Sequence, residues 1–185
     1  MSFRAFISVD LDVGEGIRQL CGELRDTGAA LKVVDPEIVH LTLKFLGDMD
    51  EKLVPGIREA MIASVEGVPP FQVRFQSVGA FPARSRPRVV WVGVKNVDPL
   101  ISIAERLDER LSSLGFEREK RLFSPHLTVA RAKGSRGMNR IQAVMDEWRD
   151  REIGVETVDS IRLKKSVLDP RGPTYSTVEE ICLGD

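Results

Sequence analysis

Apolar and polar residues alternate along the chain with two different periods, which together predict a mixed structure of strands and helices. Runs with a period of two indicate half-buried strands, and apolar residues spaced three or four apart indicate amphipathic helices. The first run is expected to lie inside a sheet. The expected strands cover residues 3–9, 31–34, 39–47, 71–78, 89–94, 123–131, 155–168 and 175–183, and the expected helices cover residues 12–28, 51–65, 98–115 and 139–148.

Turn-forming residues separate these runs and set where they are expected to begin and end. Asp12 is expected to cap the first helix, and residues 47–50 are expected to end the strand at 39–47. Residues 79–88 form an expected loop that carries three arginines. The turn at 169–173 is expected to join the last two strands into a hairpin.

The expected strand at 39–47 carries its polar residues on one face. A period of two places His40, Thr42 and Lys44 on that face, about 6–7 Å apart. An imidazole, a hydroxyl and an ammonium in a row suit an oxyanion such as phosphate, although a solvated strand face explains them equally well. The opposite face is apolar and consists of Leu41, Leu43 and Phe45.

The chain has only two histidines, and both stand in the tripeptide His-Leu-Thr on an expected strand. The second copy begins at His126, 86 residues after His40, and the order of strands and helices around the motifs occurs loosely twice. Two partly buried histidines, each satisfied by a backbone hydrogen bond, would leave the repeated threonine unexplained. Two imidazoles without nearby carboxylates or thiolates also fall short of a metal site.

Strands and helices with hairpin-like neighbours predict an α+β fold. We expect residues 1–185 to form a single bilobed domain. Each lobe is expected to contain a mostly antiparallel sheet with helices on its outer face. The cleft between the two sheets is then the natural place for a functional site.

Composition and charge restrict the functional class. The 185 residues are 42% apolar and 30% charged, as in soluble globular proteins. The net charge of −1 argues against a broad surface that coats nucleic acid but permits recognition of one phosphorylated end. Cys21 and Cys182 lack the spacing of a zinc site or a disulfide framework. With neither a signal peptide nor a membrane-length apolar run, we expect a cytoplasmic protein. Nothing in the sequence demands more than a monomer, and we expect no cofactor.

Several stretches of the sequence resemble the two-histidine (2H) phosphoesterases, and the closer match is to their RNA 2′,3′-cyclic phosphodiesterase branch, historically called 2′-5′ RNA ligases. The resemblance covers almost the whole chain and holds at all His and Thr positions of the two motifs. It implies a bilobed fold with the motifs facing each other across a central cleft, and metal-independent cleavage of a cyclic phosphate. The matching stretches are Arg4–Ile7, His40–Gly47, Gly79–Pro82, Arg86–Gly93 and Ser124–Arg131.

The leading hypothesis is a hydrolase for RNA that ends in a 2′,3′-cyclic phosphate, with tRNA halves among the candidate substrates; the resemblance implies a 2′-phosphate product. His40 and His126 supply a general acid and a general base in either order, since imidazole titrates near neutral pH. Thr42 and Thr128 face the same way as their histidines and can hold the phosphate oxygens. Two alternatives are ligation of RNA halves through a 2′-5′ bond and a non-catalytic module that binds RNA ends or nucleotides.

Other residues are weaker candidates for substrate binding. Lys44 shares the expected face of His40 and could add positive charge, or it is a solvated strand lysine. Arg131 has the opposite parity to His126 and would point away from the site unless a bulge or the strand end redirects it. Phe81 or Tyr175 could stack on a base. Phe45 and Trp91 are assigned to packing, and the basic candidates for RNA contact are Arg84, Arg86, Arg88, Arg118, Lys120, Arg121, Lys133 and Arg136.

Overall fold

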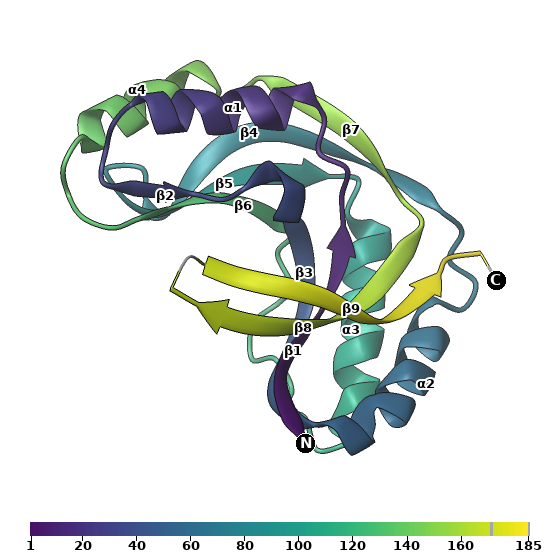
Figure 1. Cartoon of the computed structure of the whole chain (residues 1–185). Helices are drawn as coiled ribbons and strands as arrows, with labels where there is room; N and C mark the ends of the chain where they lie inside the picture. Colours follow the sequence, from purple (N-terminus) through teal and green to yellow (C-terminus); the bar gives the residue numbers. More distant parts are fainter. Residues whose placement is uncertain (171, 185) are drawn as a thin grey trace.

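The computed structural model describes residues 1–170 and 172–184 and contains two antiparallel sheets with helices on their outer sides (Figure 1). This arrangement confirms the expected α+β, bilobed architecture. No helix among the described residues is long and apolar enough to cross a membrane. The α-helices of this part of the chain cover Glu15–Asp26 (α1), Val54–Val65 (α2), Asp98–Ser112 (α3) and Met138–Glu147 (α4).

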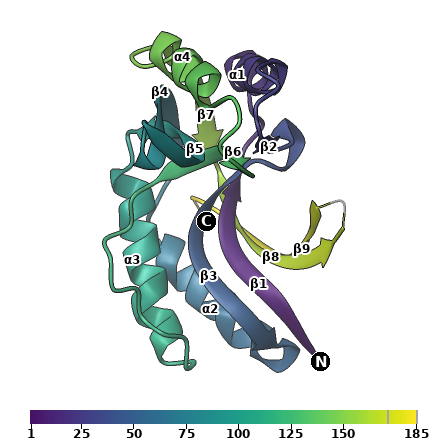
Figure 2. The ribbon, with the colours of Figure 1, turned by 90° about the vertical axis from the view of Figure 1, so that its left-hand side faces the viewer.

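The first sheet contains, in spatial order, the strands β3 (His40–Asp50), β1 (Ser2–Asp10), β8 (Ser160–Asp169) and β9 (Gly172–Cys182). β1 lies inside the sheet, because it pairs with β3 on one side and β8 on the other. Five consecutive residues of β1, Ala5 to Val9, are accordingly buried. The sheet curls strongly, and its concave side faces the other lobe (Figure 2).

The second sheet contains, in spatial order, the strands β2 (Leu31–Val33), β6 (His126–Ala132), β5 (Arg86–Lys95), β4 (Phe71–Ala83) and β7 (Glu152–Val158). Helices α1 and α4 pack on this sheet, and helices α2 and α3 pack on the first one (Figure 1). The apolar spacing of α1 explains its docking, because Ile17, Leu20 and Leu24 form one stripe and are all buried.

Neither lobe is a continuous half of the chain. The first sheet takes β1 and β3 from the N-terminal part and β8 and β9 from the C-terminal end, and the second sheet takes the strands between them together with β2. The two His-Leu-Thr motifs therefore open strands in different sheets. His40 is the first residue of β3, and His126 is the first residue of β6.

The single strand expected over residues 155–168 is wrong. The chain forms β7, which ends at Val158 next to β4, and β8, which begins at Ser160 in the other sheet. Val158 and Ile161 are both buried although they have opposite parity, which marks the change of sheet. One strand over this range would also exceed the usual length of about 3–10 residues.

Residues 79–88 are not the expected loop. β4 continues to Ala83 and β5 begins at Arg86, so only a two-residue turn separates the strands of this hairpin. Pro82 and Pro87 stand opposite each other near its end. A missing backbone donor is tolerated there because the ladder is about to stop.

Two further expected boundaries are wrong. Gly47 does not end its strand, because β3 continues to Asp50 and Gly47 accommodates a φ of +67° within it. Asp12 does not cap the first helix. Gly14 holds that position, and no side chain caps the helix there.

Candidate active site

An open cleft of about 2070 Å³ is lined by residues of both sheets and extends to α3 and the segment that follows it. Its wall includes His40 and Thr42 from β3 and His126 and Thr128 from β6. The two motif strands approach each other beside it, with Cα atoms within 8 Å. The fold therefore brings the two motifs together, although they are 86 residues apart in the sequence.

The two histidines are held by the same kind of hydrogen bond. Nδ1 of His40 lies 2.9 Å from the carbonyl oxygen of Ile38, and Nδ1 of His126 lies 2.9 Å from that of Ser124. Because a carbonyl oxygen only accepts, Nδ1 must be the donor in both bonds. Nε2 is then the nitrogen of each ring that can accept or donate a proton in a reaction.

Aromatic rings contact both histidines. Phe6 stacks on His40 with ring centroids 4.9 Å apart, and Tyr175 meets the same imidazole edge-on at 5.2 Å. Phe81 meets His126 edge-on at 5.3 Å. Both aromatic candidates from the sequence therefore lie at the motifs. Phe6 was missed, although it falls on the β1 face that also carries polar residues.

Burial lowers the pKa of His40 below its ordinary value of 6.5. The backbone hydrogen bond and the negative charge of Asp10 oppose this shift, and the positive charge of Lys164 adds to it. Asp10 lies directly opposite His40 in the β1–β3 ladder and accepts hydrogen bonds from Ser8, Arg162 and Lys164. His40 is therefore mainly neutral at pH 7 and able to accept a proton.

The ladder between β1 and β3 shifts by one residue just after the first motif. Thr42 and Lys44 pair with adjacent residues of β1, so Leu43 has no partner in that strand. Such a bulge reverses the alternation of faces. Lys44 consequently leaves the face of His40 and is buried, with 3% of its surface exposed. The expectation that the two residues share a face is wrong.

Lys44 instead joins β3 to the segment that leads to the second motif. The wide cleft reaches its side chain, but its Nζ donates to Oδ1 of Asp108 on α3 at 2.6 Å and to the carbonyl of Glu117 at 2.7 Å. Asp108 also accepts from the backbone N–H of Glu119 at 2.9 Å. A buried ammonium needs such partners, so we assign Lys44 a structural role.

The ladder between β5 and β6 repeats the shift after the second motif. Thr128 and Ala130 pair with adjacent residues of β5, and the carbonyl of Val129 instead accepts the N–H of Val34 at 2.8 Å. Val129 and Ala130 are both fully buried, and Arg131 lines the cleft. The bulge that Arg131 needed to reach the site is therefore present.

Phe45 follows His40 by five residues, as Arg131 follows His126. It is 65% exposed and lines the cleft, so its assignment to packing is wrong. The packing role of Trp91 is confirmed. Its ring lies 5.4 Å from that of Phe81 and so close to Gly79 that any Cβ there would lie 2.3 Å from the indole.

The basic candidates fall into different parts of the structure. Arg118, Lys120 and Arg121 line the cleft. Arg84 is engaged elsewhere, because it donates to the carbonyl of Val78 at 2.6 Å and to Asp146 at 2.9 Å. Within the described part of the chain, the cleft lining does not include Arg86, Arg88, Lys133 or Arg136.

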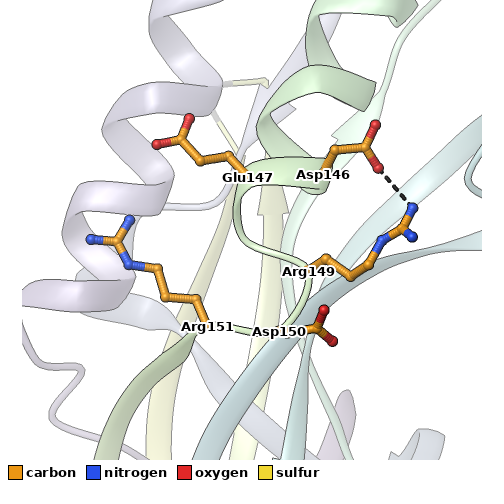
Figure 3. Close-up of a pocket in the computed structure, with 5 residues that line it drawn as sticks. All are labelled: Asp146, Glu147, Arg149, Asp150 and Arg151. Carbon is orange, nitrogen blue, oxygen red and sulfur yellow. Dashed lines mark hydrogen bonds and ion pairs between the residues drawn. The ribbon is translucent and has the colours of Figure 1, made fainter.

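A second, smaller depression of about 540 Å³ lies at the C-terminal end of α4 (Figure 3). Its charged groups interact locally, since Arg149 pairs with Asp146 at 2.9 Å and the Arg151 guanidinium lies 4.2 Å from the centroid of the Trp148 ring. No group of three or more His, Cys, Asp or Glu side chains among the described residues is arranged to hold a metal ion. The depression is lined by Asp146, Glu147, Arg149, Asp150 and Arg151.

Comparison with known proteins identifies the family. Residues 15–166 match the model of the 2′-5′ RNA ligase superfamily. The chain belongs to this superfamily. A relative from Methanothermobacter thermautotrophicus, named RNA 2′,3′-cyclic phosphodiesterase, is 37% identical over 97% of this chain and 98% of its own. A relative of the same name from Aeropyrum pernix is 39% identical, over 89% and 93% of the two chains.

Solved structures share the fold of this superfamily member. A protein from Thermus thermophilus superimposes with a TM-score of 0.76 at 26% identity, over 97% of each chain. Escherichia coli LigT, crystallised with 3′-AMP, gives a TM-score of 0.76 at 22% identity over the full length of both chains. The family resemblance seen in the sequence motifs is confirmed by these comparisons.

Proposed function

We propose that this superfamily member hydrolyses the 2′,3′-cyclic phosphate at the end of an RNA and leaves a 2′-phosphate. The observation that carries the proposal is the pair of histidines in one cleft, each with Nδ1 bound to a backbone carbonyl and Nε2 available for proton transfer. Relatives that are 31–39% identical over most of the chain bear the name RNA 2′,3′-cyclic phosphodiesterase, which supports this choice of substrate.

The two histidines take different roles in the proposed reaction. Water attacks the phosphorus in line with O3′, and neutral His40 accepts the water proton at Nε2 as the new P–O bond forms. Protonated His126 donates its proton to O3′ as the P–O3′ bond breaks. The products are a 2′-phosphomonoester and a free 3′-hydroxyl. The lowered pKa of His40 supports its role as the base.

The neighbouring side chains are proposed to hold the substrate. The hydroxyls of Thr42 and Thr128 donate to the non-bridging phosphate oxygens, where charge accumulates in the transition state. Arg131, turned into the cleft by the bulge at Val129, adds a guanidinium that can make charge-assisted hydrogen bonds to the same group. The exposed ring of Phe45 offers a stacking surface for the terminal base.

Ligation is the second candidate, because the family model is that of a 2′-5′ RNA ligase superfamily. If the 5′-hydroxyl of another RNA takes the place of water, the same base and acid produce a 2′-5′ phosphodiester and a 3′-hydroxyl. Hydrolysis and ligation therefore need the same four motif residues. They differ only in whether a second RNA end occupies the position of the attacking water.

Mass spectrometry separates these functions directly. An oligonucleotide with a terminal 2′,3′-cyclic phosphate is incubated with the protein and EDTA, with and without a second oligonucleotide that has a free 5′-hydroxyl. We expect the cyclic end to gain one water, and separate enzymatic mapping of the product to place its phosphate on O2′, because the 2′- and 3′-phosphates have the same mass. A joined product would favour ligation, an unchanged mass would favour simple binding, and loss of turnover in EDTA would contradict catalysis by side chains alone.

The pH profile tests which histidine is the base. His40 must be neutral to accept a proton, and its pKa is lowered from 6.5, so kcat/KM is expected to fall on the acidic side only below pH 6.5. In His126→Ala, which keeps His40 as the base, the residual activity should keep this acidic limb. The opposite result, in which the acidic limb disappears, would exchange the two roles.

A further inference from the structure

The outer end of the β8–β9 hairpin extends beyond the rest of its sheet. β8 pairs with β1 as far as Ser166, which stands opposite Arg4. Among the described residues, Val167 to Asp169 pair only with β9. We call residues 167–170 and 172–174 the arm. A two-stranded ribbon has little stability of its own in water. The stability of the arm therefore depends on the contacts of its side chains.

The arm presents apolar side chains at the cleft. Leu168 is 66% exposed and lines the cleft, and Pro173 and Thr174 on β9 line it as well. The next residue of β9, Tyr175, meets the ring of His40 at 5.2 Å. The exposed surface of the arm is therefore continuous with the proposed reaction centre.

Positive charge borders the arm from both sheets. Lys32 of β2 reaches across, because its Nζ lies 3.3 Å from the Cβ position that a side chain at residue 172 would take. Burial raises the pKa of Tyr175, and the positive charges of Arg131 and Arg4 oppose the rise. Among the described residues, Arg4 and Lys32 form no ion pair, and both line the cleft.

The opposite side of the cleft has a different charge pattern. The segment between α3 and β6 lies across the molecule from the arm (Figure 2). Three cations of this segment line the cleft, and two of them pair with acids, Arg118 with Asp108 at 3.2 Å and Lys120 with Glu117 at 3.3 Å. A polyanion that leaves the reaction centre toward the arm meets Lys32 and Arg4, and the arm itself adds the carboxylate of Asp169 to the cleft lining.

We propose that the arm binds the nucleotide on the 5′ side of the terminal one. Leu168 packs against the base of that nucleotide, and Lys32 and Arg4 face the phosphodiester that joins it to the terminal ribose. This inference rests on the proposed function and adds to it a substrate class. The cleft is shaped for the end of an oligonucleotide and uses a contact that a free nucleoside 2′,3′-cyclic phosphate lacks.

The test compares two substrates on the full chain. kcat/KM is measured for a dinucleotide that ends in a 2′,3′-cyclic phosphate and for the matching mononucleoside 2′,3′-cyclic phosphate. We expect the wild-type protein to prefer the dinucleotide and Leu168→Ser to lower the ratio of the two values by about fivefold, because an apolar contact is lost. The matched control is Leu122→Ser, which changes a 91% exposed leucine across the cleft and should keep the wild-type ratio.

The outcomes separate the arm from the reaction. A wild-type ratio near one, or an unchanged ratio in Leu168→Ser, would overturn the role of the arm and leave hydrolysis standing. If the wild-type protein hydrolyses neither substrate, the proposed function fails. In that case the role of the arm is tested by measuring the affinity for the intact dinucleotide. An affinity that Leu168→Ser does not weaken would contradict the inference. Because Leu168 is exposed, its replacement by serine should leave the Tm unchanged.

Discussion

Alanine in place of either cleft histidine is expected to lower kcat for the cyclic phosphate by about 10²–10⁴-fold, because each variant loses one of the two proton transfers. His40 and His126 both stand at the start of a strand and are partly exposed. The Tm of each variant should therefore remain near that of the wild-type protein. Initial rates on the oligonucleotide and thermal unfolding followed by circular dichroism measure the two quantities.

The double variant shows whether the two histidines act as a unit. Groups that cooperate in one chemical step have strongly non-additive effects. The variant with alanine at both His40 and His126 should therefore be only slightly slower than the worse of the single variants. Independent effects that multiply would contradict a concerted acid–base pair, and near-wild-type turnover in either single variant would remove that histidine from the mechanism.

Local pattern was sufficient to predict most elements of this fold. The helices at 98–115 and 139–148 were expected within a few residues of α3 and α4, because their apolar stripes are strong. The local pattern does not predict which sheet a strand joins. β7 and β8 follow each other with one residue between them and still enter different sheets. Long-range pairing decides this, and no local period reports it.

The candidate site also contains residues that the local pattern predicts and residues that it does not. The four motif residues were predictable because the two histidines share a tripeptide and a strand period. Every position beyond the motifs was harder to place, because the ladders shift at Leu43 and Val129. Both are ordinary β-branched or apolar strand residues, without the glycine that often marks a bulge. A strict period of two therefore assigned Lys44 and Phe45 to the wrong faces.

Methionine in place of Lys44 and of Arg131 tests the reversed faces, because Arg131→Met is expected to lower kcat/KM and Lys44→Met is expected to lower the stability. Arg131→Met removes a cation that faces the cleft, and the loss of charge-assisted bonds of about 1.5–3 kcal/mol should lower kcat/KM by about 10–100-fold. Its Tm should hardly change, because the Arg131 side chain is exposed.

Lys44→Met should instead destabilise the protein. The Lys44 side chain is 2% exposed and its ammonium binds Asp108 at 2.6 Å, so removing it leaves a partly buried carboxylate short of its main partner. The expected cost is about 3 kcal/mol, or a fall in Tm of about 6–12 °C for a chain of this size. At a temperature where the variant is fully folded, its kcat/KM should stay near the wild-type value. A Lys44→Met protein with a wild-type Tm and a lowered kcat/KM would indicate that the Lys44 ammonium contacts the phosphate. That result would contradict the face reversal at Leu43.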